Sequence, residues 1–376
     1  MSTTIIPITN DNLELVSRAG AKWGMPRSVG WFRRCLFDPG VEGLTDDEIR
    51  GHMSVAEDGD VVAIQGYYYM PGYFKQEKIL INTGCIMGVD SKYGEELLCL
   101  LDKNRETCKL GQVSVGNCIA NMRSAKICKV YHRMKEAPPE AKQLYRGVSD
   151  WSLYPIHILR KNLRLPLPIL KAAWYMTRPV SLLRRASIRL EERISGYNVV
   201  QYCKIDLEKF GRFWREYLAE NDGMITSREP TRLAWLFNDS LATGIVKIIA
   251  AEKNGEIKGY ALIRRYQREE GFFNNHSLYD ICALHNDAAV LKLLVRAAKR
   301  LAGDDMGLLM MYVGALPNQD KWLSPYLPTC VKGGHSMIFY GSRNKEIMQS
   351  IEEGRGWFLG PMDGERCLGH GSYIDL

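Results

Sequence analysis

One pattern of strands and turns occurs twice along the 376-residue chain, about 196 residues apart. Residues 55–70, VAEDGDVVAIQGYYYM, have the pattern of a β-hairpin closed by an Asp-Gly turn at Gly59. Residues 248–266, IIAAEKNGEIKGYALIRRY, repeat it around an Asn-Gly turn at Gly255. A repeat at a fixed offset favours two units of one supersecondary design over one large core.

The elements after each hairpin keep the same order. A long apolar strand ends at Asp90 in the first copy and at Asp287 in the second, and an apolar helix follows each strand. A further strand begins after Gly111 and after Gly307. The common order and offset favour a tandem duplication. The alternative is two generic α/β stretches that share hairpin and helix lengths.

A basic, proline-interrupted segment separates the two copies. Residues 151–190 contain no Asp or Glu, and the rest of the chain is close to neutral although the net charge is +7. Apolar residues at helical spacing, broken by prolines, predict short helices. We therefore predict a first unit over 1–131, a helical basic bridge over 132–194 and a second unit over 195–376. The basic residues of the bridge are Arg160, Lys161, Arg164, Lys171, Arg178, Arg184, Arg185 and Arg189.

Several protein classes are disfavoured. The sequence has no uncharged apolar run of about 18 residues, and its N-terminus, MSTTIIPITNDNLELV, lacks the pattern of a secretory signal. None of the ten cysteines forms a C-x-x-C pair or a zinc-like spacing. We predict a cytoplasmic protein with reduced, buried thiols and no metal.

The turn between the first long strand and its helix has the composition of an anion site. In GVDSKYGEELLCLL, Gly88 and Gly94 permit close backbone approach, and the helix is predicted to begin near Glu95. A helix N-terminus offers N–H donors and a favourable dipole to a phosphate.

This order of elements, with Val89 followed by D-S-K-Y-G and an apolar helix, resembles the GNAT acyltransferase family. The resemblance implies an α/β (α+β) fold of two GNAT-like units, each a mixed, mostly antiparallel sheet flanked by helices. It also implies that the loop holds the pyrophosphate of acetyl-CoA or another acyl-CoA, with pantetheine between two splayed strands. The implied donor-binding residues are Val89, Lys92, Tyr93, Gly94, Glu95 and Asn121.

The loops of the two copies depart from the family pattern to different extents. The usual R-G-x-G/A sequence is reduced to Tyr93-Gly94-Glu95 in the first copy. The second copy, HNDAAVLK, contains no glycine and suits a diphosphate poorly. We therefore assign acyl-CoA to the first unit and acceptor binding to the second.

Three residues are candidates for catalysis. The family's thiolate-protonating tyrosine aligns with Cys128, and Tyr131 lies close by, so Tyr131 is either this acid or a packing residue. Cys128 is a nucleophile or, with more weight, a buried structural thiol. Asp280 interrupts an apolar strand and is either a general base with a raised pKa, a solvent-facing residue or the partner of an arginine.

Three further residues are candidates for binding the acceptor. Arg228 could hold an acidic substrate group or form an ion pair at a helix start. His285 follows the second long strand, where a structural role is the alternative. Asp363 lies in the glycine-rich tail GPMDGERC, which could line the cleft between the units.

The layout also resembles tandem acetyltransferase-like proteins of bacterial surface-polysaccharide synthesis, through SREPTRLAWLFND, the basic bridge and WFLGPMDGERC. The predicted function is an acyl-CoA-dependent N-acyltransferase, with acetyl as the expected acyl group. The acceptor would be a small-molecule or glycan-precursor amine, such as an amino sugar. The alternatives are a Fem-type transferase that uses aminoacyl-tRNA and a non-catalytic GNAT-like binding protein. Residues 155–190 could contact an anionic membrane at the inner face, whereas nucleic acid is disfavoured because few aromatic residues accompany the charges.

Overall fold

The structure is a computed structural model of the chain. It describes residues 2–24, 26–37, 41, 44–45, 48–109, 111–119, 125–136, 144–148, 156, 166, 168–170, 172–173, 175–176, 179, 186, 190, 195–267, 274–304, 307–313, 323–327, 329–331 and 336–353.

The first sheet is mostly antiparallel and has a single parallel contact. Its order is β1-β2-β3-β4-β5-β15-β6, and β9 pairs with β3. All neighbours are antiparallel except β4 and β5, which run parallel because a helix connects them. The strands are β1 (Thr3–Pro7), β2 (Gly51–Ala56), β3 (Val61–Phe74), β4 (Glu77–Val89), β5 (Val113–Ile119), β6 (Lys135–Glu136), β9 (Ile225–Thr226) and β15 (Ser336–Ser342).

The second sheet repeats this arrangement of directions. Its order is β14-β7-β13-β12-β11-β10-β8, and only β12 and β13 are parallel. The predicted hairpins are β2–β3 and β10–β11, whose turns hold Gly59 and Gly255 at φ of 84° and 80°. The strands are β7 (Leu144–Val148), β8 (Asn198–Tyr202), β10 (Val246–Lys253), β11 (Glu256–Gln267), β12 (Asn274–Ala283), β13 (Gly307–Val313) and β14 (Thr329–Val331).

The two halves of the chain exchange strands. β15, from the C-terminal half, pairs with β5 along Val113–Ile119, and β7, from the N-terminal half, pairs with β13. Both β6 and β7 lie at the start of the segment predicted as a helical bridge; β7 is a strand because β13 and β14 supply its hydrogen bonds. The predicted boundaries at 131 and 194 stay predictions.

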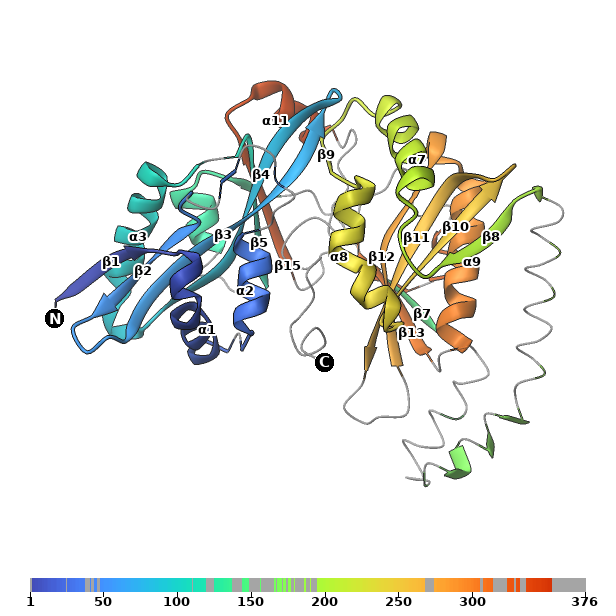
Figure 1. Ribbon diagram of the computed structural model, residues 1–376, viewed down its shortest axis with the longest axis horizontal. Coiled ribbons are helices and arrows are strands. Elements are labelled where there is room, and N and C mark those ends of the chain that lie inside the picture. Colours follow the sequence, from blue (N-terminus) through green and yellow to red (C-terminus); the bar gives the residue numbers. More distant parts are fainter. Residues whose placement is uncertain are drawn as a thin grey trace.

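Helices cover both faces of each sheet (Figure 1). In the first half α1 and α2 pack on β3 from one side, and α3 packs on β2, β3 and β4. In the second half α7 packs on β11, α8 packs on β10, and α9 packs on β10–β13. The helices are α1 (Leu13–Lys22), α2 (Val29–Leu36), α3 (Gly94–Thr107), α7 (Leu207–Ala219), α8 (Pro230–Ala242), α9 (Ala288–Asp304) and α11 (Lys345–Glu352).

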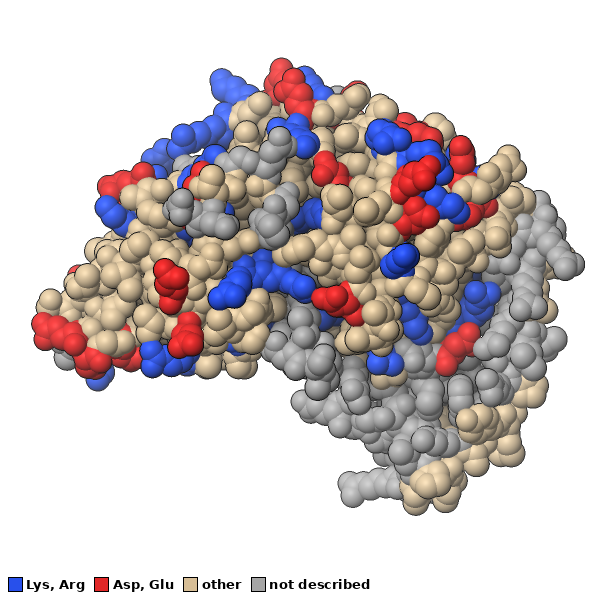
Figure 2. Space-filling model, viewed as in Figure 1, with Lys and Arg blue, Asp and Glu red and all other residues tan. Residues whose placement is uncertain are grey.

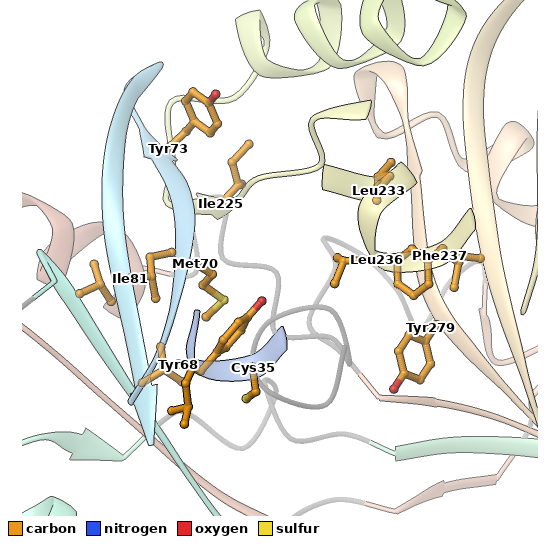
Figure 3. Packing of buried hydrophobic residues seen from close by; sticks show 14 of the residues in the cluster. Cys35, Tyr68, Met70, Tyr73, Ile81, Ile225, Leu233, Leu236, Phe237 and Tyr279 are labelled. Carbon is orange, nitrogen blue, oxygen red and sulfur yellow. The ribbon is translucent and has the colours of Figure 1, made fainter. Parts of the chain in front are cut away.

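One hydrophobic cluster spans both sheets. It runs from Cys35, Tyr68 and Met70 of the first half to Phe237 and Tyr279 of the second (Figure 3). β9 adds to the edge of β3, so backbone hydrogen bonds also join the halves. The position of one half therefore constrains the other, since separating them would expose apolar surface.

Candidate active site

The first sheet opens between its two parallel strands. β4 and β5 pair only over Ile81–Val113, Asn82–Ser114 and Thr83–Val115, yet β4 continues to Val89 and β5 to Ile119. At the closed end, Asn82 Oδ1 accepts hydrogen bonds from Gly111 N at 3.0 Å and Ser114 Oγ at 2.9 Å. The strands therefore diverge only toward their carboxyl ends.

A β-bulge lies where the strands part. Gly66 of β3 faces Ile86 and Tyr67 faces Gly84, so Cys85 is the extra residue in β4. Gly84 is exposed, and in the described part of the chain a Cβ added there would meet no atom within 4 Å. The bulge thus presents open backbone at the point where the gap begins, and a ligand can approach a strand closely at such a place.

The predicted phosphate loop follows directly. It consists of Asp90, a single turn over Ser91–Tyr93, and the start of α3 at Gly94. Lys92, Gly94 and Glu95 are exposed, and no described residue lies within 4 Å of a Cβ placed on Gly94. The side chain of the N-cap residue, Tyr93, makes no cap hydrogen bond. The space at this helix N-terminus is open, although Glu95 adds a negative charge there.

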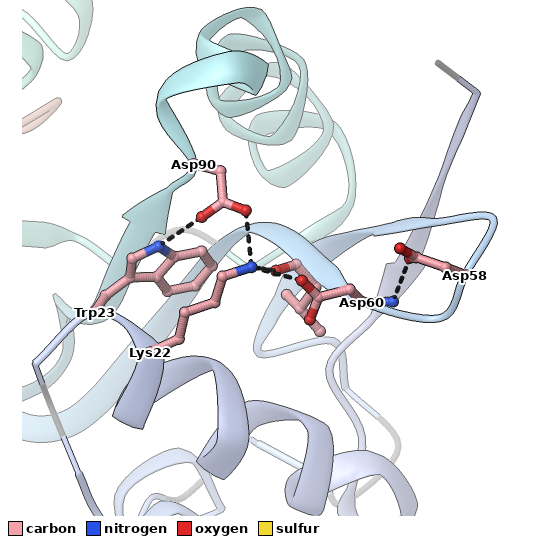
Figure 4. Close-up of polar contacts among 6 residues, drawn as sticks. Lys22, Trp23, Asp58, Asp60 and Asp90 are labelled. Atoms are coloured by element: carbon pink, nitrogen blue, oxygen red, sulfur yellow. Dashed lines mark hydrogen bonds and ion pairs between the residues drawn. The ribbon is translucent and has the colours of Figure 1, made fainter.

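Asp90 anchors the end of β4 to the rest of the first unit (Figure 4). Its carboxylate accepts from Lys22 Nζ at 2.7 Å and from Trp23 Nε1 at 3.2 Å. Lys22 also binds Asp60 at 2.6 Å, and this contact, followed by the one to Asp90, raises the pKa of Lys22 above 10.5. The Trp23 ring packs on Gly88, where a Cβ would lie 2.3 Å from it. The sequence did not predict a role for Lys22 and Trp23, because they lie about 70 residues upstream of Asp90 and belong to no recognisable motif.

The two acid candidates lie in different surroundings, Cys128 against β5 and Tyr131 against α3. Cys128 packs beside Ala125, Met134 and Phe339, and a Cβ on Gly116 would lie 2.7 Å from its sulfur. This placement matches the structural alternative for that thiol.

Tyr131 lies against the outer surface of α3. Its hydroxyl donates to Asp102, and the Arg105 guanidinium lies 4.0 Å from its ring centroid. Burial, followed by the hydrogen bond to Asp102, raises the pKa of Tyr131 to about 12. The same surroundings lower the pKa of His132 to about 4, mainly through burial.

The second sheet opens between its parallel strands in the same way, but different side chains lie at the opening. Pairing of β12 with β13 ends at Leu278–Tyr312, while β12 continues to Ala283, and Tyr279 is the extra residue of its bulge. At the following helix, Asp287 Oδ1 accepts from Ala289 N at 2.8 Å and Val290 N at 3.4 Å. The carboxylate of the chain itself therefore takes the place that an external anion would need.

Two predicted residues of the second unit meet in a buried ion pair. Arg228 Nε and Nη2 each lie 3.3 Å from Asp280, and the two residues are 5% and 6% exposed. Tyr260 donates to the same carboxylate at 2.5 Å. Among the alternatives for Asp280, the partner of an arginine is the one that this geometry matches.

His285 is exposed and takes part in a local turn. Its backbone has a φ of 56°, and its Nδ1 lies 3.0 Å from Glu220 Oε1. His285 is therefore not part of the Arg228–Asp280 pair. Tyr131 and Cys128 do not contact that pair either. Asn121 and Asp363 lie outside the described residues.

A buried cation in the second sheet was not predicted. Arg264 is 3% exposed, and its guanidinium lies 5.5 Å from the ring centroids of both Tyr266 and Tyr279. Within the described ranges its Nε has no hydrogen-bond partner. The sequence signal was weak, because an Arg-Arg pair in a strand usually marks a solvent face.

Several solved acyltransferases share this arrangement of strands and helices. N-myristoyltransferase of Saccharomyces cerevisiae with bound myristoyl-CoA and inhibitors matches 90% of this chain and 79% of its own at 11% identity, with a TM-score of 0.53. A GCN5-related N-acetyltransferase of Kribbella flavida matches 91% of this chain and 72% of its own at 12% identity, with a TM-score of 0.52. The chain has the GNAT fold.

The GNAT fold confirms the predicted fold class. The narrower likeness to surface-polysaccharide proteins and the origin by duplication stay predictions. No protein-family model and no curated protein sequence matches the chain. Over the described ranges, no helix is long and apolar enough to cross a membrane.

Proposed function

We propose that the protein is an acyl-CoA-dependent N-acyltransferase whose donor lies in the opening between β4 and β5. The observation that carries the proposal is the short parallel pairing, which stops at Thr83–Val115 with a bulge at Cys85 and an open helix N-terminus beyond. An extended pantetheine arm would lie along the exposed strand edge. The pyrophosphate would lie near Lys92 and Gly94, where N–H donors and the dipole of α3 favour it.

A comparison of the N-termini of α3 and α9 supports a donor site in the first half. The N-terminus of α3 has open space at Gly94, whereas Asp287 already accepts from the first-turn amides of α9. An anion at α9 would have to displace a carboxylate and would meet its negative charge. Myristoyl-CoA is bound in the yeast neighbour, which supports an acyl-CoA donor for this fold.

The chemistry needs few groups. A neutral amine attacks the thioester carbonyl, a strand N–H near the bulge stabilises the oxyanion, and an acid protonates the departing thiolate. In our proposal Tyr131 is the candidate acid, because a pKa of about 12 keeps its hydroxyl protonated at neutral pH. It must leave Asp102 to reach the donor. Cys128 is the weaker candidate because it packs among apolar side chains.

The acceptor amine, for which an amino sugar stays our candidate, would bind between the two sheets. Arg264 supports this placement, since it is a buried cation whose Nε has no hydrogen-bond partner among the described residues, and such a group favours an acceptor that carries an anionic group. Arg228 and Asp280 would position the second sheet, since each is buried against the other. The aminoacyl-tRNA alternative has no specific observation in its favour.

Thermal unfolding in the presence of acetyl-CoA, longer acyl-CoAs and free CoA tests the proposal. A ligand at 100 times its Kd stabilises the folded protein by about 2.7 kcal/mol and raises Tm. No shift at millimolar concentration with any of these ligands contradicts the proposal.

A pair of matched variants locates the site. Gly94→Glu places a carboxylate at the open end of α3, and Ala288→Glu places one at the corresponding end of α9. Both positions are exposed, so both variants should fold. We expect only Gly94→Glu to abolish the shift; the reverse result places the donor in the second half.

Contact with an anionic membrane through residues 155–190 is a separate proposal. All eight basic residues of this segment lie outside the described residues, but four of its described apolar side chains are exposed: Ile169, Tyr175, Met176 and Leu190. Elsewhere, basic and acidic side chains are interspersed on the face shown in Figure 2. Sedimentation with anionic and neutral liposomes at low and high salt tests it: binding to neither type contradicts the proposal.

A further inference from the structure

Two thiols meet at the bulge of β4. The Sγ atoms of Cys35, in α2, and Cys85, the extra residue of the bulge, lie 2.8 Å apart. The two residues are 50 positions apart in the sequence, so this contact depends on the fold. Neither the spacing of the cysteines nor any motif predicted it.

The two sulfurs differ in access. Cys35 is 0% exposed within the core cluster, and Figure 3 shows it beside Tyr68. Cys85 is only partly buried, and it follows the exposed Gly84 at the point where the opening begins. A small molecule in solution can therefore reach Cys85 directly but not Cys35.

We propose that Cys85 is a site of thiol–disulfide exchange and that Cys35 is its resolving partner. The oxidant is a low-molecular-weight disulfide such as oxidised glutathione. The Cys85 thiolate attacks one sulfur of this disulfide, forms a mixed disulfide and releases one glutathione thiolate. Cys35 then attacks Cys85 Sγ and passes its proton to the departing glutathione sulfur, which forms the Cys35–Cys85 bond and releases the second glutathione as a thiol. Two cysteines are oxidised, and one glutathione disulfide is reduced to two thiols.

The bond would connect α2 to the strand that carries the proposed donor site. It closes a 50-residue loop and should raise Tm, because it restricts the unfolded chain. It would also hold the bulge against α2. Oxidising conditions would then restrict the motion of the β4 backbone beside the proposed position of the thioester, and reducing conditions would restore it. This last step rests on the proposed function.

Trypsin digestion of the full-length protein after exposure to oxidised glutathione tests the pair. Cleavage yields peptides 35–50 and 79–92, each with a single cysteine. We expect these two peptides to be disulfide-linked in the wild type and separated by dithiothreitol. Absence of the linked pair, under conditions in which the exposed Cys99 and Cys203 become glutathionylated, overturns the proposal.

Single variants test the order of the steps. Cys35→Ser should accumulate glutathione on Cys85, because no resolving thiol remains. Cys85→Ser should leave Cys35 reduced, because the oxidant cannot reach it. Glutathione on Cys35 in folded Cys85→Ser would contradict the assigned roles, and the thermal unfolding of each variant establishes that it is folded.

Ligand protection separates this proposal from the proposed function. In Cys35→Ser, acyl-CoA at ten times its Kd should slow glutathionylation of Cys85 about tenfold, since only the unliganded fraction reacts. Cys203 serves as the unprotected control. A linked pair in the wild type without protection by acyl-CoA would support the thiol pair and reject the donor site at this opening.

Discussion

The two sheets share strand order, a bulge and an opening, and they differ in what lies at those places. After the bulge the first sheet has the buried Ile86, while the second has Asp280 paired with Arg228. At the next helix the first has open space at Gly94, while the second has the Asp287 cap. The shared topology thus sets where an opening forms, and a few side chains decide which half leaves the N-terminus of its helix open.

We expect the buried Arg228–Asp280 pair to be the largest of these differences in energy. Arg228→Ala should lower the free energy of unfolding by about 3–5 kcal/mol, because it leaves the Asp280 carboxylate buried without its partner. Urea unfolding measures the loss. Lys75→Ala, which removes an exposed pair with Glu346, should change it by less than about 1 kcal/mol and serves as control.

A double variant sharpens this comparison. The double variant Arg228→Leu/Asp280→Ile makes the second sheet apolar at this position, as the first sheet is. It should lower the free energy of unfolding far less than Arg228→Ala does. A single-variant cost below about 1 kcal/mol would instead show that water reaches the pair, as a substrate-binding Arg228 would require.

The cap is the next difference. Asp287→Ala should destabilise the protein by about 1 kcal/mol, because two amides of α9 lose their acceptor. The variant also opens the second N-terminus to anions. If urea unfolding shows no change, the cap does not distinguish the two halves energetically.

Gly94→Ala should change the free energy of unfolding by less than Asp287→Ala does, and it should raise it. Gly94 has a helical φ of −55°, and a Cβ there meets no atom within 4 Å among the residues whose structure is described. Alanine should therefore stabilise the protein by about 0.5 kcal/mol. Destabilisation in urea would show that the start of α3 is more crowded than its geometry indicates.

The anchor at Asp90 should give the smallest effect, visible in its pH dependence. Hydrogen bonds to Asp60 and then Asp90 raise the folded-state pKa of Lys22 above 10.5. Its stabilising contribution is therefore complete below pH 10.5 and is lost as pH rises through the folded-state pKa. The difference in urea midpoint between wild type and Lys22→Met should stay constant between pH 9 and pH 10 and shrink as pH rises above about 10.5. A difference that stays constant above pH 10.5 contradicts the account.

The sequence was sufficient to predict the repeated order of strands and helices and the fold class. Turn glycines and alternating strands are local signals, and so the hairpins around Gly59 and Gly255 could be predicted. Strand exchange could not, because β15 and β7 pair with strands far away in the sequence. The same holds for the Cys35–Cys85 contact and for the Trp23 ring on Gly88, since each depends on how α1 and α2 pack on the first sheet.

Amide hydrogen exchange with and without saturating acyl-CoA tests the central claim most directly, because one experiment reports on both openings. The account predicts slower exchange in peptides that cover residues 84–96 and no change in those that cover 279–290. Protection confined to the second range, or to neither range at ligand saturation, would contradict a donor site in the first half.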